Sequence, residues 1–202
     1  NGVKEIESSA FEGCSSLRSI VLPNSIVTID DYAFANCTAL SLINIPSKVT
    51  IIQDYTFGNC SSLTEITLPD SIICIAESAF AECVSLTSIV IPEGVTNIEY
   101  EAFIDCKSLK NITIPKSVTS LDGNIFDGTQ WLDDQQDGPI YINNCFYKYK
   151  GEMPIDFHID IKEGTTCICD YAFYQCKNLK TITLPNSLEI VGYYAFLNCS
   201  SL

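Results

Sequence analysis

Positively charged residues are scarce in this sequence. The 202 residues include 11 Lys and Arg against 25 Asp and Glu, and the formal net charge is −14 at pH 7. Nucleic-acid recognition depends on Lys and Arg that contact phosphates, and anionic membrane surfaces attract basic segments. The composition therefore argues against nucleic acid and anionic membranes as partners, and it favours a partner that is itself basic.

Residues that commonly carry catalysis are also few. His158 is the only histidine, and the sequence contains neither a Gly-rich phosphate loop nor a His-Glu-x-x-His motif. A pair of His158 with Cys167 or Cys169 is the enzyme hypothesis that the residues leave open, and no flanking motif supports it. The sequence therefore predicts a protein that is not an enzyme, with no cofactor and no metal site.

Long hydrophobic runs are missing as well. Hydrophobic residues make up 47% of the chain, yet no run approaches the roughly 18 consecutive residues that cross a bilayer. The apolar residues instead recur periodically, which a disordered chain does not show. We expect one folded domain with a sizeable core and no membrane insertion within this chain.

The apolar residues recur with a period of 23. The unit reads Ala-Phe-x-x-Cys-x-x-Leu-x-x-Ile-x-Ile-Pro-x-x-Val-x-x-Ile-x-x-x, and it is clearest from Ala33 onwards. Its phenylalanine recurs at Phe11, Phe34, Phe57, Phe80, Phe103, Phe126, Phe173 and Phe196. A fixed period of this length predicts a solenoid, in which each repeat is one turn that buries its apolar face against its neighbours.

One repeat predicts two extended pieces and a short helical turn. Ile43 and Ile45 alternate with Asn44, so the two isoleucines should point inward and Asn44 outward. Pro46 cannot donate a ladder hydrogen bond and ends this strand. A second extended piece is expected around residues 49–52, followed by a helical turn that carries Ala-Phe-x-x-Cys. Stacked turns should place equivalent strands about 4.8 Å apart in a parallel sheet.

This repeat resembles the leucine-rich repeats of BspA-like, or Treponema-type, surface proteins, and the resemblance covers nearly the whole chain. It implies a curved leucine-rich-repeat solenoid on a secreted or cell-surface protein of an anaerobic bacterium or a protist parasite. It also implies an adhesin, with host extracellular-matrix proteins such as fibronectin and fibrinogen as partners. The alternative is a rigid stalk that displays another domain of a larger protein.

Both ends of the sequence match the middle of a repeat. Val3 and Ile6 match Ile26 and Ile29, and the last two residues match Ser16 and Leu17. We therefore expect residues 1–202 to be a single leucine-rich-repeat solenoid that is a fragment of a longer protein. The total number of repeats and any further domains lie outside this sequence.

Most of the 11 cysteines form a ladder. Thr129 takes the ladder position in the turn of Phe126, and the other positions hold Cys14, Cys37, Cys60, Cys83, Cys106, Cys176 and Cys199. Stacked neighbours would be close enough for disulfides, but each cysteine has two equivalent neighbours and its Cβ should point into the core. We expect buried, reduced thiols that bond to backbone carbonyls, rather than disulfides or a metal site.

The remaining cysteines are Cys74, Cys145, Cys167 and Cys169. Cys167 and Cys169 flank the inward-facing Ile168, so both are predicted to face outward as plain thiols. A Cys-x-Cys pair alone is a weak signal for redox or metal chemistry.

The repeat is interrupted by an irregular insert at residues 127–156. Two β-rich runs surround Asn143-Asn144 and predict a β-hairpin, since Asn tolerates the positive φ of a tight turn. The aromatic residues of the insert are Trp131, Tyr141, Tyr147 and Tyr149. Aromatics beside lysines are typical of protein-binding hot spots, which makes these four candidate binding residues. The alternative is that they cover the core where a regular turn is missing.

A second candidate binding surface is the outward row of the first strand. The residue between the two inward positions is Val21, Asn44, Thr67, Val90, Thr113, Asp160 or Thr183. In leucine-rich repeats this face is often the concave binding surface, so these residues are candidate contacts for a protein or a glycan. The alternative is that Thr and Val occupy these positions because they favour strands.

Overall fold

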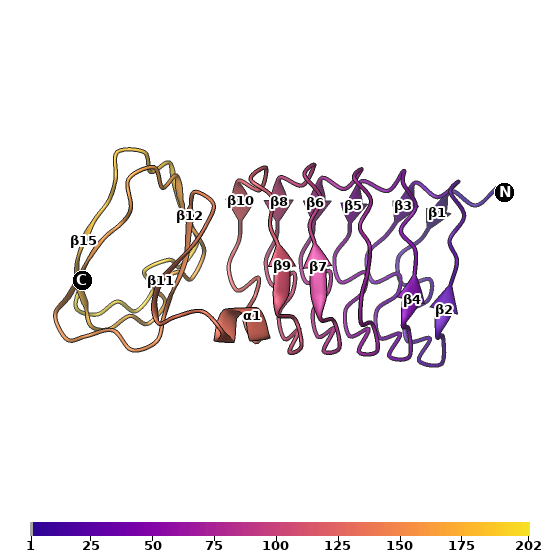
Figure 1. Ribbon diagram of the computed structural model, residues 1–202, viewed down its shortest axis with the longest axis horizontal. Helices are drawn as coiled ribbons and strands as arrows, with labels where there is room; N and C mark the ends of the chain where they lie inside the picture. The colour runs from indigo at the N-terminus through magenta and orange to yellow at the C-terminus, as the bar shows by residue number, and fades with distance from the viewer. Residues whose placement is uncertain (1) are drawn as a thin grey trace. The chain divides into compact units, whose positions relative to one another are not determined.

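The computed structural model describes residues 2–202 and has the repeating, strand-rich turns that the period of 23 predicts (Figure 1). The chain divides into two compact units. The first contains the residues up to Val118 together with Ile125–Asp134, and the second contains Thr119–Asn124 and Gln135–Leu202.

Two rows of very short strands run through the first unit. One row contains β2 (Ser19–Ile20), β4 (Leu42–Ile43), β7 (Ser88–Val90) and β9 (Asn111–Thr113). The other contains β1 (Glu5–Ile6), β3 (Thr28–Ile29), β5 (Ile51–Ile52), β6 (Cys74–Ile75) and β8 (Asn97–Ile98). The pairs are parallel and one repeat apart, as in Ile20↔Ile43 and Ile52↔Ile75, so the predicted register is confirmed.

The first unit ends at a single turn of helix. Helix α1 (Gln130–Asp133) is the one α-helix among residues 2–202. Its N-cap is Thr129, whose hydroxyl accepts the Leu132 N–H at 3.2 Å and donates to the Phe126 carbonyl at 2.6 Å. The residue that replaces a ladder cysteine therefore starts the helix. No helix in the described part of the chain is long and apolar enough to cross a membrane.

The second unit contains the predicted β-hairpin. The bounds of its strands are β10 (Ser120–Leu121), β11 (Gly138–Ile142), β12 (Cys145–Lys150), β13 (Phe157–Asp160), β14 (Cys167–Ile168), β15 (Leu179–Thr183) and β16 (Ile190–Val191). Strands β11 and β12 are antiparallel around Asn143-Asn144, and Asn143 has a φ of 51°. Strand β12 then continues into a parallel sheet in the order β12-β14-β16, while β13 pairs in parallel with β15.

The predicted helical turn at Ala-Phe-x-x-Cys is wrong. These segments are chains of hydrogen-bonded turns in which the residues two before and two after the Phe have positive φ, such as Tyr32 at 57° and Asn36 at 60°. Backbone bonds also run from one turn to the next, including Phe34 N to the Thr56 carbonyl at 2.9 Å. Alternating φ keeps the backbone extended enough to form this ladder, which a helix would not allow.

Columns of identical side chains fill the core of each unit. In the first unit, neighbouring Phe rings from Phe11 to Phe126 stack with centroids 5.1 to 5.8 Å apart. In the second, Phe146, Phe173 and Phe196 form a shorter stack. Ile43 and Ile45 are buried and Asn44 is exposed, as predicted. The alternation of the sequence therefore sets which side chains reach the surface.

The cysteine ladder consists of reduced thiols. All 11 cysteines lie in the described part of the chain and form no disulfide, and Cys37, Cys60, Cys83 and Cys106 are fully buried. Each of these four thiols donates to a carbonyl of the preceding turn, as Cys106 does to Phe80 at 3.0 Å. The prediction of buried thiols bonded to backbone carbonyls is confirmed for these four; in the same ladder Cys14 is exposed, and Cys176 and Cys199 are half-buried.

Candidate interaction surface

The outward row of the first strand is exposed at every position that the sequence predicts. Its members in the first unit are Val21, Asn44, Thr67, Val90 and Thr113, and those in the second are Asp160 and Thr183. Val21 is 85% exposed and Val90 65% exposed, beside Leu42 at 61%. The row thus carries apolar side chains that the core does not bury.

The side chain of Asn44 links two consecutive turns. Its side-chain oxygen accepts the Leu22 N–H at 2.8 Å, and its amide nitrogen donates to the Leu22 carbonyl at 2.9 Å. The amide therefore extends the ladder between two consecutive turns beyond the end of β2 and β4. Because both ends of the amide are engaged, Asn44 is less free to contact a partner than Val21 or Val90.

A groove opens on the strand face between two turns of the first unit. It has a volume of about 300 Å³. One turn contributes residues 65–68 and Asp70 to its lining, and the next contributes β7 and Pro92. Thr67 and Val90, two of the predicted row residues, both line it. Residues 65–68 form no regular strand. The groove therefore combines an apolar floor with the carboxylates of Glu65 and Asp70.

The strand face of the second unit is polar. His158 lies between Asp160 and Thr181, with Nε2 2.9 Å from Asp160 Oδ1 and Nδ1 2.6 Å from Thr181 Oγ1. Hydrogen bonds from Thr183 and then from His158 lower the pKa of the exposed Asp160 carboxyl. All four side chains lie in the open on β13 and β15. The only histidine thus belongs to an exposed polar cluster on a strand face.

Tyr147 and Trp131, two of the four insert aromatics, differ in how far they are buried. Tyr147, on β12 of the second unit, is 1% exposed, so its burial contradicts the prediction that it contacts a partner. Trp131, in α1 of the first unit, is half-buried with its ring centroid 5.0 Å from that of Phe126. Its backbone N–H also donates to the Leu109 carbonyl at 2.8 Å. Trp131 therefore extends the Phe column at α1.

Tyr141 and Tyr149 are half-buried at the edge of the core of the second unit. Tyr141 packs edge-on against Phe146, its hydroxyl accepts the Lys162 N–H at 3.2 Å, and Lys162 Nζ lies 4.1 Å from its ring centroid. Tyr149 packs edge-on against Phe157, with centroids 5.5 Å apart. These contacts favour the alternative interpretation, in which the insert aromatics cover the core.

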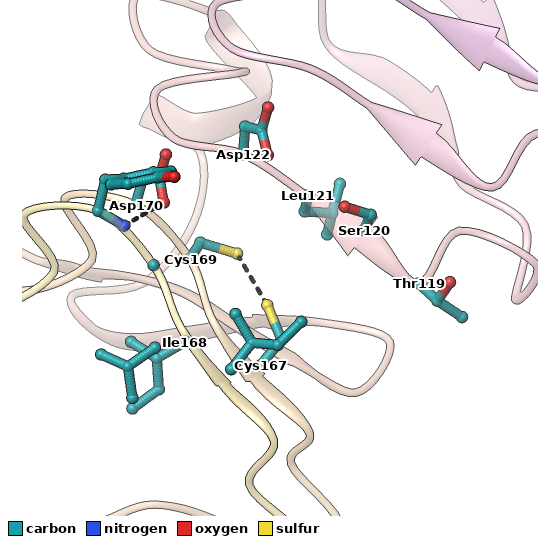
Figure 2. A pocket seen from close by; sticks show the side chains of 12 residues that line it. Thr119, Ser120, Leu121, Asp122, Cys167, Ile168, Cys169 and Asp170 are labelled. Carbon is teal, nitrogen blue, oxygen red and sulfur yellow. Dashed lines mark hydrogen bonds between the residues drawn. The ribbon is translucent and has the colours of Figure 1, made fainter.

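Three cysteines meet in the second unit, which was not predicted from the sequence. The Sγ atoms of Cys145, Cys167 and Cys169 all lie within 4.8 Å of one another, and all three residues are buried. The prediction that Cys167 and Cys169 face outward is wrong. They are only 7% and 1% exposed, and they face the segment Thr119–Asp122 across a cleft (Figure 2). The available signal was the 22-residue spacing of Cys145 and Cys167, close to one repeat.

The three thiols influence one another. Hydrogen bonds from the Cys167 and Cys169 thiols lower the pKa of Cys145, and the same bonds with Cys145 raise the pKa values of Cys167 and Cys169. Burial opposes ionisation at all three positions. Cys145 also lies 3.7 Å, measured from Sγ, from the Thr119 carbonyl. One negative charge is thus more stable in the cluster than in the ladder, where burial raises the pKa of Cys60 to about 12.

Comparisons with known proteins identify the repeat. No curated protein gives a significant match. Among solved structures, a leucine-rich repeat protein of T. pallidum is 26% identical with a TM-score of 0.59, and the match covers 91% of this chain and 77% of that one. The pneumococcal vaccine antigen PcpA is also 26% identical, with a TM-score of 0.58, and the match covers 97% of this chain and 54% of that one.

The sequence profile of the "BspA type Leucine rich repeat region" matches residues 4–133 and 141–202, in 6 copies. The match leaves out only the first three residues and 134–140, a stretch that includes the beginning of β11. The 23-residue register, the Phe column and the parallel strand rows are the structural counterparts of this repeat. The chain belongs to the BspA-type leucine-rich repeat family.

Proposed function

We propose that this chain is a non-enzymatic protein-interaction module of a secreted or cell-surface protein, and that it binds a basic segment of an extracellular protein. The family supports an interaction module. The similarity to a protein named as a pneumococcal vaccine antigen supports a surface location. Within this proposal the partner is an extracellular-matrix or host surface protein, and the module acts as an adhesin.

The groove at Thr67 and Val90 is the observation that carries the proposal. It lies along an exposed row that presents Val21 and Val90 to solvent, so it offers apolar surface together with a concave shape. Glu65 and Asp70 line it, and the chain has a net charge of −14. An apolar groove edged with carboxylates suits a peptide segment with an aliphatic side chain flanked by Lys or Arg.

The polar strand face of the second unit supports a non-enzymatic role. The contacts of His158 with Asp160 and Thr181 lie on an exposed strand surface. A general acid or base acts on a bound substrate, and enzymes bind their substrates in concave sites that exclude part of the water. We assign this cluster to the solvated surface of β13 and β15.

The test is direct binding to immobilised fibronectin and fibrinogen at physiological salt, with the wild-type chain and two double variants. Thr67→Lys with Val90→Lys places two positive charges inside the groove, where they repel a basic partner segment. Thr181→Lys with Thr183→Lys adds the same charge on the exposed strand face of the second unit and is the matched control. We expect saturable binding that weakens by about 10-fold or more in the groove variant and persists in the control.

Two results would contradict the proposal. Binding that is lost in the control variant and kept in the groove variant would place the contact on the second unit. Absence of saturable binding to either protein would remove the assignment as an adhesin for these matrix proteins. Circular dichroism and urea unfolding of all three proteins establish that a loss of binding is not a loss of fold.

A further inference from the structure

The cluster of Cys145, Cys167 and Cys169 differs from the cysteine ladder in its geometry. Ladder thiols lie in successive turns and donate to backbone carbonyls, whereas these three sulfurs face one another. Cys74, the remaining cysteine off the ladder, lies near Glu99 Oε1 at 3.4 Å and belongs to no such group. We propose that Cys145, Cys167 and Cys169 bind one thiophilic metal ion, of the class of Zn²⁺ and Cu⁺.

The distances between the sulfurs fit a single ion. Two thiolates bound to one Zn²⁺ at about 2.3 Å in a tetrahedral or trigonal arrangement have sulfurs about 3.8 to 4.0 Å apart. The Sγ atoms of Cys167 and Cys169 are 3.9 Å apart, and every pair in the cluster lies within 4.8 Å. Closing the triangle around an ion therefore requires side-chain shifts of less than about 1 Å, which χ1 adjustments supply.

The backbone holds the three cysteines in this arrangement. Cys145 and Cys167 are paired residues on the parallel strands β12 and β14. Cys169 lies two residues after Cys167 and so projects from the same face of the chain. Gly192 packs so closely against the Cys169–Asp170 backbone that an added Cβ would collide with it. A site built on paired strands keeps its ligands in place before the ion arrives.

A metal ion can reach the cluster through a cleft, and the three thiols leave room for a further ligand to the ion. Cys167 and Cys169 line a cleft of about 420 Å³ together with Asp170, which follows Cys169, and Asp122 on the facing segment (Figure 2). Carboxylates at the mouth of a cleft attract cations. Three thiolates satisfy a trigonal Cu⁺, and they leave the fourth position of a tetrahedral Zn²⁺ to water or a carboxylate oxygen. The sulfur-rich donor set excludes Mg²⁺ and Ca²⁺, which prefer oxygen ligands.

The first test is a Zn²⁺ titration of the reduced chain under anaerobic conditions against a chromophoric chelator. We expect one Zn²⁺ per chain in wild type. The variants Cys145→Ser, Cys167→Ser and Cys169→Ser should each weaken binding by about 100-fold or more. The matched control, Cys74→Ser, removes an off-ladder thiol outside the cluster and should leave the affinity unchanged. Replacing Zn²⁺ with Cd²⁺ should give a thiolate charge-transfer band that decreases in each cluster variant.

A second test uses the wild-type chain and does not depend on the folding of any variant. The reduced protein is alkylated with and without stoichiometric Zn²⁺, and each cysteine is quantified by peptide mass spectrometry. Zinc should protect Cys145, Cys167 and Cys169 and leave the labelling of Cys14 and Cys74 unchanged. An identical labelling pattern with and without zinc would overturn the proposal. So would a titration in which the reduced wild-type chain takes up no stoichiometric ion.

Discussion

The thiol of Cys60 donates a hydrogen bond to the backbone carbonyl of Phe34, with Sγ 3.3 Å from the oxygen. Donor and acceptor are 26 residues apart, which is one repeat plus three residues. The same spacing recurs in the bonds of Cys37 to Phe11 and of Cys83 to Phe57. Each thiol therefore links the turn that carries it to the preceding turn, close to the stacked Phe rings.

Replacing Cys60 with Ala should lower the free energy of unfolding by about 1–2 kcal/mol, because it removes a buried group and one hydrogen bond. The Phe34 carbonyl keeps its backbone bond from Cys37 N at 3.2 Å, which limits the loss. Cys14→Ala is the control, since Cys14 is exposed. Urea denaturation measures both variants, and equal losses would contradict a structural role for the Cys60 thiol.

The ladder thiols should also make the protein unstable in alkali. Burial raises the pKa of Cys60 from 9.0 to about 12 and that of Cys37 to about 11. Below pH 9 both thiols are neutral in the folded and unfolded chains, so their pKa shifts do not change the free energy of unfolding. As the pH rises above 9, the unfolded chain releases these protons first, and stability falls until the folded thiols ionise.

The measurement is the free energy of unfolding by urea at several pH values on both sides of 9.0, the ordinary pKa of a cysteine thiol. Wild type should lose stability with rising pH, and Cys60→Ala should lose it with a shallower slope, because one titrating group is gone. Equal slopes for the two proteins would show that the Cys60 pKa is unchanged by folding.

Much of the fold follows directly from the repeat. The alternation of Ile43, Asn44 and Ile45 predicts which side chains of one turn point inward. Because every turn repeats this pattern 23 residues later, stacking the turns gives the rows of strands and the buried columns. The Ala-Phe turns were mispredicted because an i, i+3 spacing of Phe34 and Cys37 is typical of a helix. Tyr32 and other side chains that seldom adopt positive φ give no local signal of the turns that form.

The cysteine cluster was harder to predict because it depends on distant parts of the chain. Cys145 reaches Cys167 only because β12 takes the place of a regular turn beside β14. Burial of the pair also needs the segment that begins at Thr119, whose carbonyl lies near Cys145 Sγ. The exposed row at Val21, Thr67 and Val90, by contrast, needs only strand alternation, and all of its members are exposed as predicted.

Positive φ in the Ala-Phe turns gives a third prediction. Glu82 has a φ of 59° and an exposed side chain, so its backbone conformation dominates the effect of a substitution. Glu82→Val should be about 1–2 kcal/mol less stable than Glu82→Gly, because only glycine adopts the left-handed region without a steric cost. Chemical denaturation of the two variants gives this difference.

The same pair of substitutions at Glu12 provides the control. Glu12 is exposed and its φ is not positive. There the order should reverse, with Glu12→Val at least as stable as Glu12→Gly, since glycine adds entropy to the unfolded chain. The same order at both positions would contradict the role assigned to the positive φ of Glu82.

The last prediction separates a core role from a binding role for the insert. Tyr147 is 1% exposed. It is next to Phe146 on β12, whose ring stacks on Phe173 in the core of the second unit with centroids 4.5 Å apart, and alternation along the strand turns Tyr147 to the opposite, also buried, face. Tyr147→Ala should lower the free energy of unfolding of that unit by about 3–5 kcal/mol, as expected for truncating a buried aromatic. Tyr193→Ala, at a side chain that is 79% exposed, should change it by less than about 0.5 kcal/mol. Hydrogen exchange of the β12 and β14 amides resolves the effect on this unit. Unchanged protection in Tyr147→Ala would mean that the tyrosine does not hold the hairpin to the sheet, and the insert would again be a candidate binding surface.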